Sequence, residues 1–495
     1  MKTADYLALD ATGLSEVIRN RQVSPTEVLE AAIARAEQVN PTLNAICLPL
    51  YQQARNQVET VKGPFQGVPF LLKDLGQEQS DAPCTFGSQG LRNNRPAQDS
   101  EFTRRCRLAG LNIMGRTATP ELGLKAVTES RLWGPSLNPW DHRRTPGGSS
   151  GGSGAAVAAG IVPMAGANDG GGSIRIPAAY NGLFGLKPSR GRVSAAPYHS
   201  ETWTGASADL VVSRSVRDSA LLLDQLAGNV PGDPFTIANP VNRYRDMVRR
   251  PPESLRIGFF THSPYGTAVS PDCVAAVEDT ARLLEELGHQ VVPAAPRYDG
   301  PALARSYLTL YFGEVAAAMA DAMENHGAKS SDFEVETRFL GMLGQSLSAL
   351  EYVRDRRLWN HYARALGNFF GDYDLYLCPT TGQPPALIGE LETPSHLKFL
   401  SSVMVAFRAG KMAMKSGVVD DLALQSLART PFTQLANLTG TPAMSMPLHW
   451  NQEGLPVGVH FGAAHGREDL LFQLAGQLEQ ARPWWHRYLP LQDAF

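Results

Sequence analysis

Cysteine is scarce in this sequence, and its few copies are scattered. Five cysteines occur among 495 residues, and no two of them are spaced as Cys-x-x-Cys. The odd number and wide spacing exclude a disulfide framework and a zinc knuckle, and they fit a reducing compartment. Clusters of histidine, cysteine and carboxylate residues at metal-ligand spacing are missing as well. We therefore expect neither a metal nor another cofactor.

Long apolar runs and a charge excess of one sign are also lacking. The first ten residues, MKTADYLALD, contain no apolar core of a signal peptide. No uninterrupted apolar run of about 18 residues occurs, so no membrane span is indicated. The net charge of −3 leaves no electrostatic footprint for nucleic acid. We expect a cytoplasmic protein without a membrane or nucleic-acid partner.

The N-terminal segment carries the signals of a helix. Ser24 can cap it, Pro25 suits its first turn, and Glu27 completes a capping box with Ser24. Apolar residues then recur at helical spacing on one face: Val28, Leu29, Ala32, Ile33 and Ala36. We interpret residues 1–60 as a helical arm.

Strand-like and helix-like stretches alternate after this arm. The predicted strands are GVPFLLKDL (67–75), LNIMG (111–115), LRIGFF (255–260), HQVV (289–292) and a hairpin of PAMSMPL (442–448) with VGVHF (457–461). The predicted helices are EFTRRCRLAG (101–110), a segment from Ser270 to Gly288, and GREDLLFQLAGQLEQ (466–480). This alternation indicates an α/β fold with a mixed central sheet in one large domain. A division near residue 250 stays open.

Two glycine-rich islands lie close together, GGSSGGSG (147–154) and NDGGGSIRIP (168–177). A phosphate-binding loop would need Gly-Lys-Ser/Thr, whereas alanines follow the first island here. A nucleophile elbow matches the G-x-S-x-G pattern at 147–151, with His199, His262 and His460 downstream. That motif requires a preceding strand, and the polar, proline-broken NPWDHRR stands there instead.

Tight loops without chemistry are the commonest use of glycine and serine. Such loops do not account for the alanines on one side of the islands or for Asp169 and Arg175 on either side of Ser173. The islands therefore point to a site that needs close backbone packing around serine.

The two islands together carry a family likeness. TPGGSSGGSGAAVAAG with NDGGGSIRIPAAYNGLFGLKPSRGRVS resembles the amidase signature, and Ser173 follows Ser149 by the 24 positions that the pattern requires. GVPFLLKDL is similar to the family's upstream lysine motif, and NPWDHRR is similar to its Asn-Pro-Trp lead-in. The likeness extends from about residue 15 to the C-terminus. It implies an amide hydrolase whose catalytic domain, residues 61–495, has a mixed twisted sheet covered by helices on both faces.

The resemblance assigns a catalytic triad to three positions. Ser173 would be the nucleophile, Ser149 would follow a cis peptide bond and relay a proton, and Lys73 would be the base. A lysine must be uncharged for this role, and burial at the end of an apolar strand lowers its pKa. Backbone N–H groups beside the nucleophile would form the oxyanion hole: Gly170, Gly171, Gly172 and Ser173.

The second island departs from the common family pattern. Many members have Thr-Asp-Ile/Thr-Gly-Gly-Ser where this chain has Asn168-Asp169-Gly170-Gly171-Gly172-Ser173. Because the donors are backbone groups, we expect the oxyanion hole to survive. Asp169 and Arg175 are expected to form an ion pair that holds the nucleophile turn.

The substrate pocket is expected to come from segments outside the signature. They are KAVTESRLWG (125–134), with Val127 and Thr128 as candidate contacts, SYLTLYFGE (306–314) and SSVMVAFRAG (401–410). Their aromatic and methionine side chains favour an apolar, linear or cyclic aliphatic amide over a small charged acid.

Other stretches, NDGGGSIRIP among them, resemble a sub-group that cleaves a cyclic 6-aminohexanoate oligomer. An aryl or alkyl acylamidase, a carbamate hydrolase and an amidotransferase subunit are the alternatives. A small-molecule amide is the one partner we expect, and a homodimer stays open.

Overall fold

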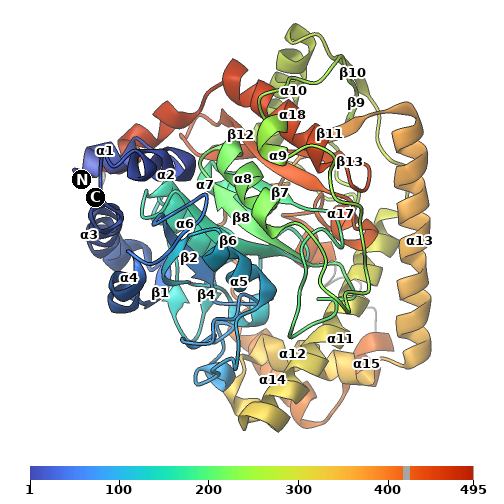
Figure 1. Ribbon diagram of the computed structural model, residues 1–495. Helices are drawn as coiled ribbons and strands as arrows, with labels where there is room; N and C mark the ends of the chain where they lie inside the picture. The colour runs from blue at the N-terminus through green and yellow to red at the C-terminus, as the bar shows by residue number, and fades with distance from the viewer. Residues whose placement is uncertain (416–423, 494–495) are drawn as a thin grey trace.

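A mixed β-sheet runs through the middle of the molecule (Figure 1). The computed structural model describes residues 1–415 and 424–493, and within these ranges the sheet has eleven strands. Their spatial order is β1 (Ile46–Pro49), β3 (Asn112–Thr117), β2 (Pro69–Lys73), β6 (Met164–Asp169), β8 (Ala208–Ser213), β7 (Phe184–Lys187), β12 (Ala443–Trp450), β13 (Pro456–Ala463), β11 (Leu375–Pro379), β9 (Arg256–Phe259) and β10 (Gln290–Pro293). A separate pair, β4 (Glu129–Ser130) and β5 (Gly134–Pro135), lies outside it.

The strand directions decide where the functional side chains meet. β2 pairs in parallel with β3 on one side and with β6 on the other, where Leu71 lies opposite Ala165. Because parallel strands end at the same edge of a sheet, Lys73 at the end of β2 lies near Asn168 and Asp169 at the end of β6. β8 runs antiparallel to β6, with Asp209 opposite Asn168.

The alternation predicted from the sequence is confirmed. The strands expected in residues 67–75, 111–115, 255–260 and 289–292 are β2, β3, β9 and β10, and the predicted hairpin is β12 with β13. The helices expected between them are α5 (Glu101–Leu108), α10 (Pro271–Glu286) and α18 (Glu468–Ala481). Ser270 caps α10 by accepting a hydrogen bond from the Asp272 N–H.

The first 60 residues are mostly helical and lie at the left of Figure 1, where the two chain ends are neighbours. Their helices are α1 (Thr3–Leu7), α2 (Ala11–Arg19), α3 (Pro25–Leu43) and α4 (Tyr51–Gln57). The predicted capping box of α3 is present between Ser24 and Glu27. The segment also supplies β1, which pairs with β3 at the sheet edge, so it is part of the sheet as well as a helical arm.

Helices cover both faces of the sheet, as expected. On one face lie α6 (Gly151–Ala158) and α7 (Arg175–Asn181), which contact each other and β6, β12 and β13. On the other face α18 packs with α8 (Val216–Leu226) and α9 (Tyr244–Met247), and the Phe472 ring of α18 lies beside Phe184 of β7. The site described below lies on the α6–α7 side, at the carboxyl ends of β2 and β6.

A second apolar cluster is formed mainly by residues of helices that lie in the lower and right part of Figure 1. These helices are α11 (Gly300–His326), α12 (Val335–Ser346), α13 (Ala349–Asp372), α14 (Ser395–Ala406), α15 (Gly410–Lys415) and α17 (Gln434–Thr439), and α19 (Leu489–Asp493) lies near the end of the chain. Among the residues that the structure describes, no helix is long and apolar enough to cross a membrane.

Candidate active site

Lys73 is a fully buried lysine at the end of a fully buried strand. Its Nζ lies 2.7 Å from the Ser149 hydroxyl oxygen and 2.7 Å from Asn168 Oδ1. Its backbone is fixed on both sides, since the Lys73 N–H donates to Gln77 Oε1 and the Lys73 carbonyl accepts from Arg116. The amine is therefore held in place at the side of Ser149.

Burial lowers the pKa of Lys73 from its ordinary value of 10.5 to about 7, because desolvation disfavours the ammonium form. The nearby carboxylates Asp209 and Asp169 act in the opposite direction without cancelling this effect. A substantial fraction of the amine is thus uncharged at neutral pH, as a general base requires.

Ser149 stands in a tightly packed loop and is 2% exposed. The Gly148–Ser149 peptide bond is cis. Thr128 spans this loop, because its hydroxyl donates to the Gly147 carbonyl at 2.8 Å and accepts from the Gly151 N–H at 3.1 Å. A Cβ on Gly148 would lie 2.6 Å from the Val127 nitrogen, so the 125–127 backbone fits only against glycine. Val127 and Thr128 therefore shape the serine loop, and their contact with substrate stays a prediction.

Ser173 lies in the turn between β6 and α7, half-buried, and its hydroxyl makes no hydrogen bond within the described parts of the chain. The turn is anchored by Asp169, which accepts from the Gly172 N–H at 2.6 Å and from the Ile174 N–H at 3.2 Å. Gly172 has φ +128°, a conformation that disfavours any other residue. The turn presents Ser173 with a hydroxyl free to reach a ligand.

The Asp169–Arg175 ion pair forms as the sequence suggested. Two Arg175 nitrogens, Nε and Nη2, each lie 2.9 Å from an Asp169 oxygen, and both side chains are fully buried. Burial alone would raise the pKa of Asp169, but the Arg175 charge and its hydrogen bonds hold that pKa well below the usual range. Asp169 is therefore a permanent anion that fixes the backbone on both sides of Ser173.

Two of the three glycines before Ser173, Gly170 and Gly171, face aromatic side chains. A Cβ on Gly171 would collide with the Tyr307 hydroxyl, and a Cβ on Gly170 would lie 3.1 Å from the Trp203 ring. Thr433 and Gln434 donate hydrogen bonds to the Gly171 carbonyl, which turns that carbonyl toward α17. The N–H of Gly172 is already bound to Asp169. Gly170, Gly171 and Ser173 remain as candidate donors to an oxyanion.

Asn168 is the site residue that the sequence did not single out for a role. The chain shows it as part of a departure from the family pattern, but nothing in the sequence indicates its contact with Lys73. That contact depends on the parallel pairing of β2 with β6, which brings together residues from distant parts of the chain.

The nucleophile-elbow alternative lacks its structural requirements. No strand leads into Ser149, because residues 145–147 have no regular structure and residues 148–150 form a bend. His460, one of its candidate histidines, lies fully buried with Nε2 3.1 Å from Arg175 and Nδ1 3.4 Å from the Cys378 sulfur. Burial and the Arg175 charge lower the pKa of His460 well below 6.5, so the imidazole is neutral at neutral pH and serves as a buried partner of Arg175.

The two predicted pocket segments on later helices differ in their contacts with the glycine–serine loops. Residues 306–314 lie on α11, where Tyr307 touches Gly171 and the Tyr311 hydroxyl donates to the Leu124 carbonyl beside the Ser149 loop. Residues 401–409 lie on α14 and the turn after it, and Gly410 begins α15. Helix α14 packs against α12, and Phe407 in the turn is 81% exposed.

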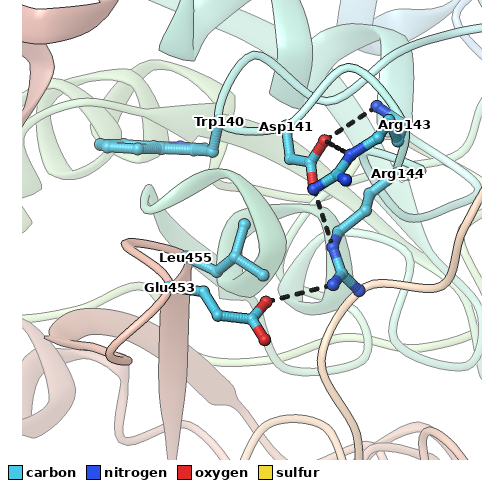
Figure 2. Close-up of a pocket in the computed structure, with 6 residues that line it drawn as sticks. All are labelled: Trp140, Asp141, Arg143, Arg144, Glu453 and Leu455. Atoms are coloured by element: carbon cyan, nitrogen blue, oxygen red, sulfur yellow. Dashed lines mark hydrogen bonds and ion pairs between the residues drawn. The ribbon is translucent and has the colours of Figure 1, made fainter.

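A surface pocket of about 390 Å³ lies elsewhere, beside the NPWDHRR segment (Figure 2). Figure 2 shows the Asp141 carboxylate between Arg143 and Arg144, with Glu453 bound to Arg144. Its six lining residues include none of the predicted triad. We interpret it as a polar surface feature.

Comparison with known proteins agrees with this geometry. The family model described as Amidase matches residues 27–472. The 6-aminohexanoate-cyclic-dimer hydrolase of Paenarthrobacter ureafaciens is 39% identical over 492 residues, covering 96% of this chain and 95% of that relative.

Solved structures give the same result. A 6-aminohexanoate cyclic dimer hydrolase complexed with substrate has a TM-score of 0.89 at 37% identity and covers 98% of this chain and 100% of its own. A bacterial aryl acylamidase of the amidase signature enzymes has a TM-score of 0.85 at 26% identity, with 98% of each chain covered. The chain therefore belongs to the amidase signature family and is an enzyme that hydrolyses amide bonds.

Proposed function

We propose that this enzyme cleaves an apolar aliphatic amide, cyclic or linear, through an acyl-enzyme on Ser173. The observation that carries the proposal is the 2.7 Å contact between the buried Lys73 amine and the Ser149 hydroxyl. A buried amine with a pKa near 7 can accept a proton from a hydroxyl, and a serine between it and the nucleophile can pass that proton on.

In the first half-reaction, Ser149 gives its proton to Lys73 and takes the proton of Ser173. The Ser173 oxygen then bonds to the amide carbonyl carbon, and the carbonyl oxygen becomes an oxyanion. Backbone N–H groups of Gly170, Gly171 and Ser173 are the proposed donors to that oxyanion, where each donor contributes about 2.7–4 kcal/mol.

Collapse of this intermediate breaks the carbon–nitrogen bond. The leaving amine takes its proton from Lys73 by way of Ser149, and the acyl group stays on Ser173 as an ester. Water then loses a proton along the same route and attacks the ester. The bond between the acyl carbon and the Ser173 oxygen then breaks, and that oxygen takes the proton back from Lys73 through Ser149. The products are a carboxylic acid and the free Ser173 hydroxyl, which restores the starting state.

Two observations support an aliphatic amide such as a 6-aminohexanoate oligomer. The similar proteins reported above include hydrolases named for the cyclic dimer of 6-aminohexanoate. Aromatic side chains from α11 and the loop before β8 lie next to Gly170 and Gly171, with the Trp203 and Tyr311 rings 5.4 Å apart. In our proposal, the methylene groups of the substrate pack against these rings.

The same rings favour an aryl acylamidase as the second candidate, because an aromatic acyl or amine group can pack against them.

A cytoplasmic location is part of our proposal, since the five cysteines are free thiols, which fits a reducing compartment.

A panel of amides tests the proposal. The purified enzyme is given cyclic and linear 6-aminohexanoate dimers, an anilide and a small aliphatic amide, and the products are identified by mass spectrometry. We expect the highest kcat/KM for an aliphatic dimer. A preference of tenfold or more for the anilide would select the second candidate, and no hydrolysis of any amide would overturn the proposal. Ser173→Ala enzyme, checked for folding by circular dichroism, is the blank.

A further inference from the structure

The side-chain amide of Asn168 can have only one orientation. Its Nδ2 lies 2.8 Å from the Leu75 carbonyl oxygen, and its Oδ1 lies 2.7 Å from Lys73 Nζ. A backbone carbonyl only accepts hydrogen bonds, so the amide nitrogen must face Leu75. The amide oxygen must then face Lys73, and it accepts one N–H of the amine.

This hydrogen bond limits the directions in which the second N–H and the lone pair of the neutral amine can point. A neutral amine has two N–H bonds and one lone pair. Since Asn168 Oδ1 takes one N–H, rotation about the Cε–Nζ bond is restricted, and the lone pair can be directed to the Ser149 hydroxyl on the other contact. Asn168 is 8% exposed, so water competes little for these hydrogen bonds.

Asn168 also stands between the amine and a carboxyl group. Asp209 lies opposite Asn168 in the pairing of β6 with β8, and its carboxyl receives hydrogen bonds from Gln77 and Asn168. The charged and titratable groups around the amine come from several elements: Asp209 on β8, Asp169 on β6, Arg116 on β3, and Asp74 and Glu78 in the segment after β2. The two groups in direct contact with Nζ are nevertheless neutral, the Asn168 amide and the Ser149 hydroxyl.

We propose that Asn168 is a positioning residue for Lys73, which directs the amine's lone pair to Ser149 and keeps a neutral acceptor where a carboxylate would favour the ammonium form. This inference rests on the proposed function, in which Lys73 is the base. It gives a purpose to the asparagine that stands where many family members have threonine.

The test is the pH dependence of kcat/KM and kcat for Asn168→Asp and Asn168→Ala, with an amide from the panel above. In the proposed mechanism, we expect activity to rise with pH as Lys73 loses its proton. Asn168→Asp keeps the shape but puts a negative charge beside Nζ, so we expect the acidic limb to move up by about one pH unit or more. Asn168→Ala should lower kcat by roughly tenfold or more through loss of orientation, with KM within about twofold of wild type.

Asn138→Ala is the matched control. Asn138 is another fully buried asparagine whose Nδ2 donates to two carbonyls, those of Thr145 and Tyr180, away from Lys73. We expect it to lower the melting temperature and to leave the acidic limb in place.

The proposal is overturned if folded Asn168→Asp keeps the wild-type limb. Should Asn168→Asp fail to fold, Asn168→Ala decides, and a wild-type kcat in that variant would refute the role. A different result tests the proposed function: if Lys73→Ala still hydrolyses amides, the base assignment fails whatever Asn168 does.

Discussion

Individual residues decide the chemistry of this site through burial. A lysine on the surface is charged at neutral pH, whereas Lys73 is fully buried with a pKa near 7. Its partners are the neutral groups Ser149 and Asn168. The fold therefore maintains this amine in the uncharged form that the proposed base role needs, at a cost in stability.

That cost predicts a pH-dependent stability. Unfolded lysine binds a proton up to about pH 10.4, whereas folded Lys73 loses it near pH 7, so stability rises with pH between these values by up to about 1.4 kcal/mol per unit. Lys73→Met has no titratable amine and therefore lacks this pH-dependent contribution to stability. We will compare the free energy of unfolding of the variant with that of wild type by urea titration. The difference, Lys73→Met minus wild type, should be largest at pH 6–7 and should fall towards pH 9.5.

Lys187→Met is the control for this experiment. Lys187 is also buried, and burial with the Arg175 charge lowers its pKa to about 7. It should share the stability trend and still show the acidic limb of hydrolysis, whereas Lys73→Met should be inactive. Parallel stability curves for Lys73→Met and wild type would contradict the burial account.

Ser149 and Ser150 are adjacent buried serines, and only Ser149 contacts Lys73. Ser149→Ala should lower kcat by at least about a thousandfold, because it interrupts the route between Lys73 and Ser173. Ser150→Ala removes an equally buried hydroxyl that bonds only weakly, at 3.4 Å, to the Asn168 carbonyl. We expect it to lose less than about tenfold in steady-state assays. Equal losses in the two variants would argue against a relay through Ser149.

At the scale of elements, helix α11 limits the turn that carries Ser173. The Tyr307 hydroxyl occupies the space beside Gly171 that a Cβ would need. Gly171→Ala should therefore displace the turn that holds the proposed oxyanion donors and reduce kcat by roughly a hundredfold, comparable to the loss of one donor. Tyr307→Phe removes the colliding oxygen, so the double variant should recover part of the activity in steady-state kinetics. Losses that simply add would show that this contact is not the cause.

The anchor between β6 and α7 gives a prediction about stability. Asp169→Asn leaves Arg175 buried without its anion, and such a change costs about 3–5 kcal/mol of unfolding free energy. Glu30→Gln is the exposed counterpart, since the side chains of Glu30 and its partner Arg55 are 45% and 39% exposed, and it should change stability far less. Thermal and urea unfolding of both variants measure the difference, and similar losses would contradict the role of the buried pair.

For the whole molecule, the sequence predicted most local elements but few of the contacts between residues that are far apart in the chain. The capping box of α3, the strand that ends at Lys73 and the β12–β13 hairpin were all legible in the sequence, because each depends on neighbouring residues. The family likeness predicted the triad Lys73, Ser149 and Ser173, and the catalytic roles of these residues stay predictions. The contact of Asn168 with Lys73 and of Tyr307 with Gly171 could not be predicted, since both require the strand order of the sheet and the placement of α11.

The identity of the acylated residue tests the central claim most directly. Enzyme mixed with a slowly hydrolysed amide or activated ester is quenched in acid, digested and mapped by tandem mass spectrometry. We predict one acyl group, attached to Ser173 and absent from Ser173→Ala. An acyl group on Ser149, or hydrolysis that continues unchanged in Ser173→Ala, would contradict the account.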